Sequence, residues 1–131
     1  MRRAVEIREG VYWVGAVDWN IRDFHGYTTN RGTTYNAYLV VGEEKTALVD
    51  SVKAPFATEM LSRIETVLDP ARIDYVVVNH VEMDHSGALP MLLERASGAR
   101  LLATENGIKA LQRHYRRDWP MESVKTGREV D

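Results

Sequence analysis

Short apolar runs separated by turn residues predict a series of β-strands in the first half of the chain. Apolar and polar residues alternate weakly over Ala4–Glu9, more strongly over Val11–Val17, and again over Thr33–Val41. A further strand is expected at Thr46–Val49, after the short polar connection Gly42–Lys45, which is typical of a hairpin.

In the second half, apolar residues at helical spacing alternate with short strands. The spacing predicts a helix over Ala54–Leu68, ended by Asp69-Pro70, and a second helix with Ser86 as its N-cap. A third helix is expected from Thr104 to about Tyr115. Strands are expected beside these helices at Tyr75–Val78, Arg100–Ala103 and Met121–Thr126. We therefore expect an α/β (α+β) fold with a mixed sheet and flanking helices.

The strand expected at Tyr75–Val78 leads into a loop rich in groups that bind metals. Its consecutive valines suit a strand buried on both faces. In an extended or loosely turning loop, alternate side chains project to the same side, so His80, Glu82 and Asp84 can converge. His85 breaks this alternation and can reach the same region from another angle, or a neighbouring region. This spacing favours two adjacent metal ions, each with one imidazole and one carboxylate. A polar, solvated loop is the alternative interpretation.

The pattern H-x-E-x-D-H in this loop resembles the metallo-β-lactamase superfamily, whose hydrolases carry H-x-H-x-D-H. Because Glu82 replaces the second histidine, the segment Asn79–Pro90 is more similar to the flavodiiron proteins, which reduce dioxygen or nitric oxide. A carboxylate donor favours iron over zinc relative to an all-imidazole set. The resemblance implies His80 and Glu82 as ligands of one iron, and Asp84 and His85 as the positions that serve the other.

Two other segments extend the resemblance to flavodiiron proteins. Residues 18–27, D-W-N-I-R-D-F-H-G-Y, lack periodicity and predict a long loop. By resemblance, His25 in this loop lies near the metals and shapes the pocket; a surface or packing histidine is the alternative. Asp50 is implied as a hydrogen-bonding support of the metal loop, with Asn79 as a second candidate for such a role. A turn or helix-capping acid is the alternative for Asp50.

Composition and charge narrow the possible functions. The 131 residues fit one domain with its own core. A formal net charge of −2 gives no general attraction to nucleic acid or to an anionic membrane. The cations within Lys109–Arg117 are interpreted as a solvated helix end whose charges oppose the helix dipole, with nucleic-acid binding as the alternative. The lack of cysteine excludes disulfides, iron–sulfur clusters and rubredoxin-type iron sites in this sequence. With no signal-like apolar core and no stretch of membrane length, we expect a cytoplasmic protein.

The resemblance covers nearly the whole chain, but only about the first half of a metallo-β-lactamase-like αββα domain. In complete flavodiiron proteins, the second half supplies two more histidines and a metal-bridging aspartate, and a flavodoxin-like domain carries FMN. The resemblance therefore implies two iron ions and FMN in the complete protein, with an electron donor such as rubredoxin or a flavin reductase. Residues 1–131 are expected to be an N-terminal portion of the domain that is inactive alone.

Two other functions stay open. A zinc-dependent hydrolase of the wider superfamily would use a metal-bound hydroxide to attack an ester or amide, although Glu82 counts against it. A non-catalytic module, from a truncated or split gene, would bind metal weakly or not at all. Because half of a layered sheet domain leaves an apolar face and unpaired strand edges, we also expect self-association or a complementary chain.

Overall fold

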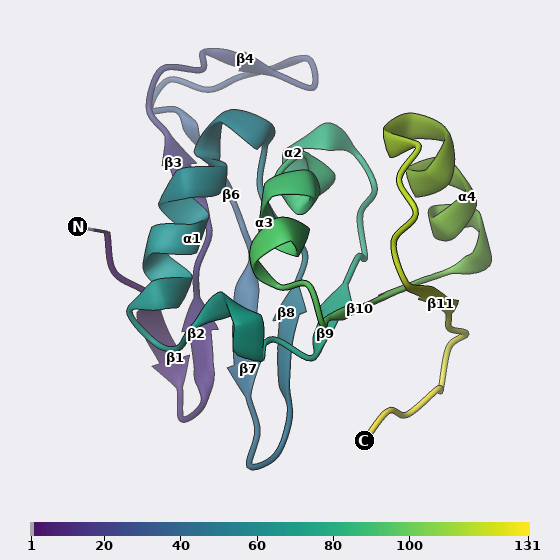
Figure 1. The fold of residues 1–131 in the computed structure, drawn as a ribbon. Coiled ribbons are helices and arrows are strands. Elements are labelled where there is room, and N and C mark those ends of the chain that lie inside the picture. Colours follow the sequence, from purple (N-terminus) through teal and green to yellow (C-terminus); the bar gives the residue numbers. More distant parts are fainter. Residues whose placement is uncertain (1) are drawn as a thin grey trace.

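The structure, a computed structural model, describes residues 2–131 and is built around a seven-stranded mixed sheet (Figure 1). The strand order across this main sheet is β1-β2-β7-β8-β9-β10-β11. Two further two-stranded sheets pair β3 with β6 and β4 with β5. The strand bounds are Val5–Arg8 (β1), Val11–Trp13 (β2), Ala16–Asp18 (β3), Asp23–Phe24 (β4), Tyr27–Thr28 (β5), Thr33–Tyr35 (β6), Tyr38–Val41 (β7), Thr46–Val49 (β8), Tyr75–Val77 (β9), Arg100–Ala103 (β10) and Met121–Ser123 (β11).

Helices join the strands of the second half. β7 and β8 form the expected antiparallel hairpin, whereas β8, β9, β10 and β11 pair in parallel and therefore need crossover connections. The connecting helices are α1 (Ala57–Glu65), α2 (Met83–Ser86), α3 (Leu89–Arg95) and α4 (Glu105–Tyr115), with 3-10 turns at Ala54–Phe56 and Pro70–Arg72. Within residues 2–131, no helix combines the length and apolar character needed to cross a bilayer.

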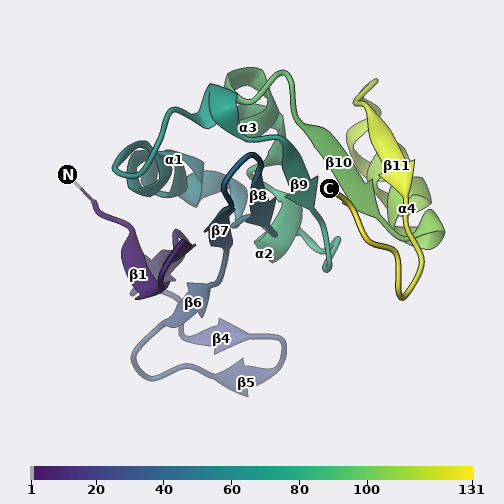
Figure 2. The same cartoon turned by 90° about the horizontal axis from the view of Figure 1, so that it is seen from below.

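The core lies between the main sheet and the helices α1 and α3, which pack on one face of it (Figure 2). Leu48, Val76 and Leu101 stand in register on neighbouring strands and are completely buried. Burying a side chain of this kind contributes about 1.5–3 kcal/mol. The apolar stripes of the helices meet this row through Met60, Ile64, Leu89 and Leu92.

Two of the strands expected from the sequence are each broken in two. Val11–Val17 is interrupted at Gly15, and Thr33–Val41 is interrupted at Asn36-Ala37. β2 and β7 belong to the main sheet, whereas β3 and β6 pair separately, so both segments leave the main sheet together. A Cβ at Gly15 would lie 2.1 Å from the carbonyl oxygen of Tyr35, so the bend needs glycine. The prediction that each of these segments forms one continuous strand is therefore wrong.

The second face of the main sheet is more exposed than predicted. Val76 and Val78 are 0% and 4% exposed, but Tyr75 and Val77 are only half-buried. Val40, which lies in the same row as Tyr75, is 38% exposed. The prediction that this strand is buried on both faces is wrong for residues 2–131, because the core helices α1 and α3 cover one face.

Candidate metal centre

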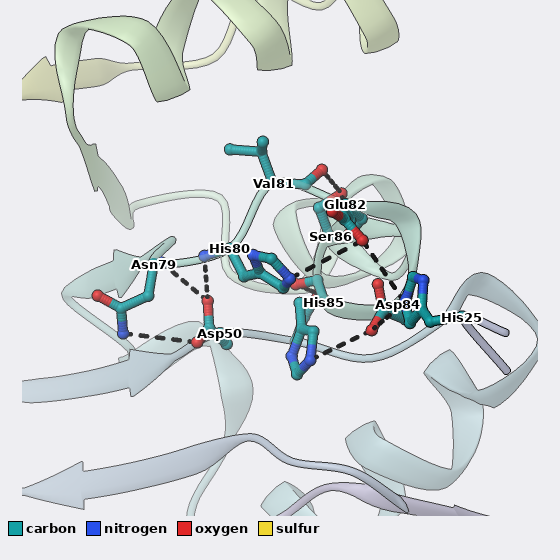
Figure 3. A network of polar contacts seen from close by, with 10 residues as sticks. His25, Asp50, Asn79, His80, Val81, Glu82, Asp84, His85 and Ser86 are labelled. Carbon is teal, nitrogen blue, oxygen red and sulfur yellow. Dashed lines mark hydrogen bonds and ion pairs between the residues drawn. The ribbon is translucent and has the colours of Figure 1, made fainter. Parts of the chain in front are cut away.

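The candidate centre lies at the C-terminal ends of β8 and β9, two neighbouring strands in the middle of the main sheet (Figure 3). Because these strands are parallel neighbours, the residues that follow them meet at the same edge. Asp50 follows β8, and its Oδ1 accepts hydrogen bonds from the backbone amides of Asn79 (2.8 Å) and His80 (3.2 Å). Its Oδ2 accepts a longer bond from the Asn79 side chain at 3.5 Å. Asp50 thus holds the start of residues 79–87, called the metal loop below.

The metal loop, expected to be extended or loosely turning, passes into the short helix α2. The amide and hydroxyl of Ser51 both donate to the carbonyl oxygen of His85, at 3.0 and 2.8 Å, which fixes α2 against the end of β8. From Met83 onward, a helical turn and not strand-like alternation places Asp84 and His85. Of the expected group, Glu82 and Asp84 come together with His25, whereas His80 lies beside Glu82 and His85 lies beside Asp84.

Ser86 is not the N-cap of the following helix, as the sequence suggested. It is the last residue of α2, and Ala88 occupies the N-cap position of α3 without a side-chain cap. Between them, Gly87 approaches the chain before α1 so closely that a Cβ would lie 2.6 Å from the backbone nitrogen of Ala54. The tight turn therefore leaves no room for a longer loop or a larger residue.

Two carboxylate–imidazole pairs form within the metal loop. Glu82 Oε2 lies 3.9 Å from His80 Nε2, and Asp84 Oδ2 lies 3.3 Å from His85 Nε2. The rings of the two histidines are 5.1 Å apart between centroids. The Glu82 and His80 side chains are about half exposed, at 54% and 51%, whereas that of Asp84 is only 10% exposed. One pair thus faces the solvent and the other lies deeper.

His25 reaches both carboxylates from a separate part of the chain. It lies at the tip of the hairpin between β4 and β5, so the expected long loop contains a small sheet. His25 and Gly26 have φ values of +52° and +79°, as a two-residue hairpin turn of type I′ requires. The His25 Nε2 is 3.6 Å from Glu82 Oε2 and 3.9 Å from Asp84 Oδ2. The structure therefore brings His25 to the metal loop.

A buried pair beneath the hairpin supports this placement. Tyr35 is completely buried, and its hydroxyl donates to Asp18 Oδ2 at 2.8 Å. The ring of Phe24 packs edge-on against both Tyr35 and His25, with centroid separations of 5.9 and 4.1 Å. Burial raises the pKa of Tyr35 far above its ordinary value; the hydrogen bond to Asp18 and the charges of Asp18 and Asp84 act in the same direction. Tyr35 therefore stays a protonated donor.

The side chains fit a metal centre. Ligand atoms of His25, Glu82 and Asp84 all lie within 4.8 Å of one another. Donor atoms about 2.0–2.2 Å from one ion are about 3–4 Å apart, and the contacts above span 3.3–3.9 Å. The Nδ1 atom of His85 is buried without a hydrogen-bond partner among residues 2–131, and such an atom needs a ligand or donor. Mixed imidazole and carboxylate donors are typical of non-haem iron.

A cleft of about 670 Å³ opens beside the metal loop. His25, Glu82 and Asp84 line it together with Arg113 and His114 of α4. A solvated helix end is the expectation for the cations near the end of α4, and Arg113 and His114 are indeed exposed. Their position at the cleft was missed, because helical periodicity does not show which distant loop an exposed helix face meets.

The sheet edge with its histidine- and carboxylate-rich loop defines a metallo-β-lactamase-like protein. A family model described as "ODP family beta lactamase" matches residues 33–129, which is most of the chain. The chain belongs to this family. The expected fold class is confirmed.

Three similar proteins extend this assignment. The chain is 50% identical over 133 residues to the "Nitric oxide reductase" of Moorella thermoacetica, covering 99% of this chain and 33% of that protein. The structure of rubredoxin oxygen:oxidoreductase from Desulfovibrio gigas matches with a TM-score of 0.90 and 49% identity, over 96% of this chain and 32% of that one. The flavodiiron protein from Giardia intestinalis matches with a TM-score of 0.92 and 36% identity, over 100% and 32%.

These matches confirm the resemblance to flavodiiron proteins. The chain corresponds to the β-lactamase-like N-terminal domain of its relatives and spans about a third of their length. The matched residues contain the metal loop.

Proposed function

We propose that the chain is the metal-binding, β-lactamase-like portion of a flavodiiron-type oxidoreductase, which reduces dioxygen to water or nitric oxide to nitrous oxide. The observation that carries this proposal is the meeting of two carboxylate–imidazole pairs with His25 at one sheet edge. The names of two relatives, a nitric oxide reductase and a rubredoxin oxygen:oxidoreductase, support the same class of reaction. Because those proteins are about three times longer, the activity is proposed for a complete protein, with residues 1–131 inactive alone.

The donor residues form two pairs, and His25 lies close to the carboxylate of each pair. His80 and Glu82 would hold one iron ion, and Asp84 and His85 would serve the other, while His25 would shape the pocket beside both carboxylates. Iron supplies the ability to accept and donate single electrons when it is bound. Four electrons and four protons convert dioxygen to two waters, and two electrons and two protons convert two nitric oxides to nitrous oxide and water.

The electrons would come through FMN in a flavodoxin-like domain of the complete protein, supplied by rubredoxin or a flavin reductase. The name of the Desulfovibrio gigas relative, rubredoxin oxygen:oxidoreductase, supports rubredoxin as the donor. The test is oxidation of reduced rubredoxin by dioxygen with and without the complete protein. A cytoplasmic location belongs to the same proposal and is checked by cell fractionation.

Self-association or binding of a complementary chain would cover the open face of the main sheet. This face carries Val40, which is 38% exposed, and the half-buried Tyr75, which lies in the same row across the strands. β1 and β11 are the outermost strands of the main sheet, and the backbone N–H and C=O groups on their outer sides would be available to pair with a strand of a partner. Sedimentation velocity over a range of concentrations tests this part. A monomer at the highest concentration would exclude self-association and leave only the complementary chain.

Elemental analysis of the chain purified without oxygen tests the metal site. We expect about two iron ions per chain in an assembly that completes the site, with loss of iron in His80→Ala. The matched control is His114→Ala, which removes a cleft histidine outside the donor group. Zinc in place of iron would favour the hydrolase alternative. Near-zero metal in all three proteins would refute the proposal for this chain and favour the non-catalytic alternative.

A further inference from the structure

The hydroxyl of Ser86 connects the metal loop to α4. Ser86 is completely buried, and its Oγ lies 2.7 Å from the carbonyl oxygen of Val81 and 3.0 Å from that of Glu82. The same Oγ is 2.7 Å from the Tyr115 hydroxyl. Because Tyr115 is the last residue of α4, this contact joins the loop after β9 to a helix that follows the next strand.

The direction of these hydrogen bonds follows from the number of available protons. Carbonyl oxygens only accept, so the single Ser86 proton must be donated toward Val81 and Glu82 for either bond to exist. The hydroxyl of Tyr115 must then donate to Ser86 Oγ. The bonds form a short chain that runs from the phenol through the serine to the backbone of the metal loop.

Tyr115 is suited to act as a fixed donor. Its ring packs against Trp119 and His114, with centroid separations of 5.5 and 4.6 Å. α4 ends directly after it, at Arg116 in a left-handed conformation with a φ of +51°. Burial raises the pKa of Tyr115, with a smaller opposing effect of the Ser86 hydrogen bond, so the phenol keeps its proton at neutral pH.

We propose that Tyr115 is a positioning residue of the metal loop. Through Ser86 it holds the carbonyl groups on both sides of the Glu82 nitrogen and α-carbon, and so sets the point from which the Glu82 side chain enters the cleft. Within the described residues the Glu82 side chain makes no capping bond to α2, so its position depends on its backbone, whose carbonyl also accepts the amides of His85 and Ser86 at 2.9 Å. The bonds of Asp50 reach only Asn79 and His80, at the start of the loop. The consequence for metal binding rests on the proposed function.

The experiment uses Tyr115→Phe in the full 131-residue chain. This variant removes the hydroxyl but keeps the ring that packs on Trp119. In the metal-free chain, we expect amide hydrogen exchange at His85 and Ser86 to become several-fold faster, since their amides bond to Glu82, while the β8 and β9 amides are unchanged. In anaerobic titrations with ferrous ion, we expect the dissociation constant to rise about tenfold.

Two further variants separate positioning from general stability. Tyr12→Phe, which removes a hydroxyl on β2 in the row of the core residue Leu39 and away from the metal loop, is the matched control and should change neither measurement. Ser86→Ala combined with Tyr115→Phe should bind ferrous ion no worse than Ser86→Ala alone, because both changes break one chain of hydrogen bonds. Independent, additive losses would overturn the proposed relay.

The two readouts also separate this inference from the proposed function. Faster exchange at His85 and Ser86 in Tyr115→Phe supports the positioning role, even if the unmodified chain binds no ferrous ion and the metal proposal fails. Unchanged exchange overturns the positioning role whether or not the chain binds iron. Faster exchange with unchanged iron affinity in a chain that binds iron also overturns it, because the loop would then move without affecting the ligands.

Discussion

Asp50 offers the sharpest test of how the metal loop is held. Its carboxylate accepts the backbone amides of Asn79 and His80, at 2.8 and 3.2 Å, and its own backbone is left-handed with a φ of +61°. A substitution at Asp50 therefore removes hydrogen bonds and also changes the cost of an unusual backbone conformation. Alanine and glycine separate these two effects, since neither can accept the bonds but glycine adopts positive φ freely.

The magnitudes follow from this geometry. A hydrogen bond to a charged acceptor contributes about 1.5–3 kcal/mol, and holding a residue with a Cβ in the left-handed region costs about 1–2 kcal/mol. Asp50 is partly exposed and aspartate itself carries some of that backbone cost. We expect Asp50→Ala to lower the free energy of unfolding by about 2–4 kcal/mol, and Asp50→Gly to lower it by about 1 kcal/mol less.

Urea unfolding followed by tryptophan fluorescence measures both differences in the metal-free chain. Asp118→Ala, at an exposed position on the segment after α4, is the matched control and should stay within about 0.5 kcal/mol of the unmodified chain. The reasoning is refuted if Asp50→Ala behaves like this control. It is also refuted if Asp50→Gly is less stable than Asp50→Ala, because the left-handed backbone would then carry no cost.

Three further predictions concern the turns and the buried phenol. Gly87→Ala should lower the free energy of unfolding by about 1–3 kcal/mol, since the added Cβ would lie 2.6 Å from a backbone nitrogen. Gly98→Ala is the control, because a Cβ added there would have no described atom within 4 Å apart from its chain neighbours. Gly26→Ala, at a φ of +79°, should cost about 1 kcal/mol and shift the His25 ring signals in NMR spectra; unchanged signals would contradict the hairpin's role. The raised pKa of Tyr35 means that its contribution to stability is complete below about pH 10 and is lost as pH rises through the folded-state pKa. Unfolding measured at stepped alkaline pH should therefore show a shallower decline in Tyr35→Phe.

The arrangement of the metal loop was largely predictable from the sequence because it depends on local order. A buried strand, a polar loop and a helix follow one another along the chain, and parallel pairing of β8 with β9 places Asp50 beside the loop. The histidine–carboxylate pairs then follow from their spacing. The expectation of an extended or loosely turning loop through Asp84 missed the helical turn at Met83–Ser86, since a short, mostly polar segment carries no periodic signal that separates an extended loop from one helical turn.

Other parts of the site depend on contacts that a linear pattern does not contain. The breaks at Gly15 and Asn36-Ala37 move two strands out of the main sheet. Glycine and asparagine are disfavoured inside strands and mark these bends, but they do not show which sheet each half of the segment joins. His25 reaches the loop because Phe24 of the same hairpin packs against Tyr35 beneath it, a contact that only the folded chain makes. The resemblance of residues 18–27 to a flavodiiron segment indicates that His25 lies near the metals, but it does not explain which contacts bring His25 to the metal loop.

The supports of the metal loop share one physical property, which bears on how metal would bind. Asp50 holds backbone amides, Ser51 holds the carbonyl of His85, and the Tyr115–Ser86 pair holds the carbonyls of Val81 and Glu82. All three act on main-chain atoms and come from elements outside the loop or from its buried end. The donor side chains are therefore not needed to shape the backbone. Metal binding should accordingly stabilise the fold through mass action without ordering the loop, so circular dichroism should change little while the unfolding midpoint rises with metal concentration.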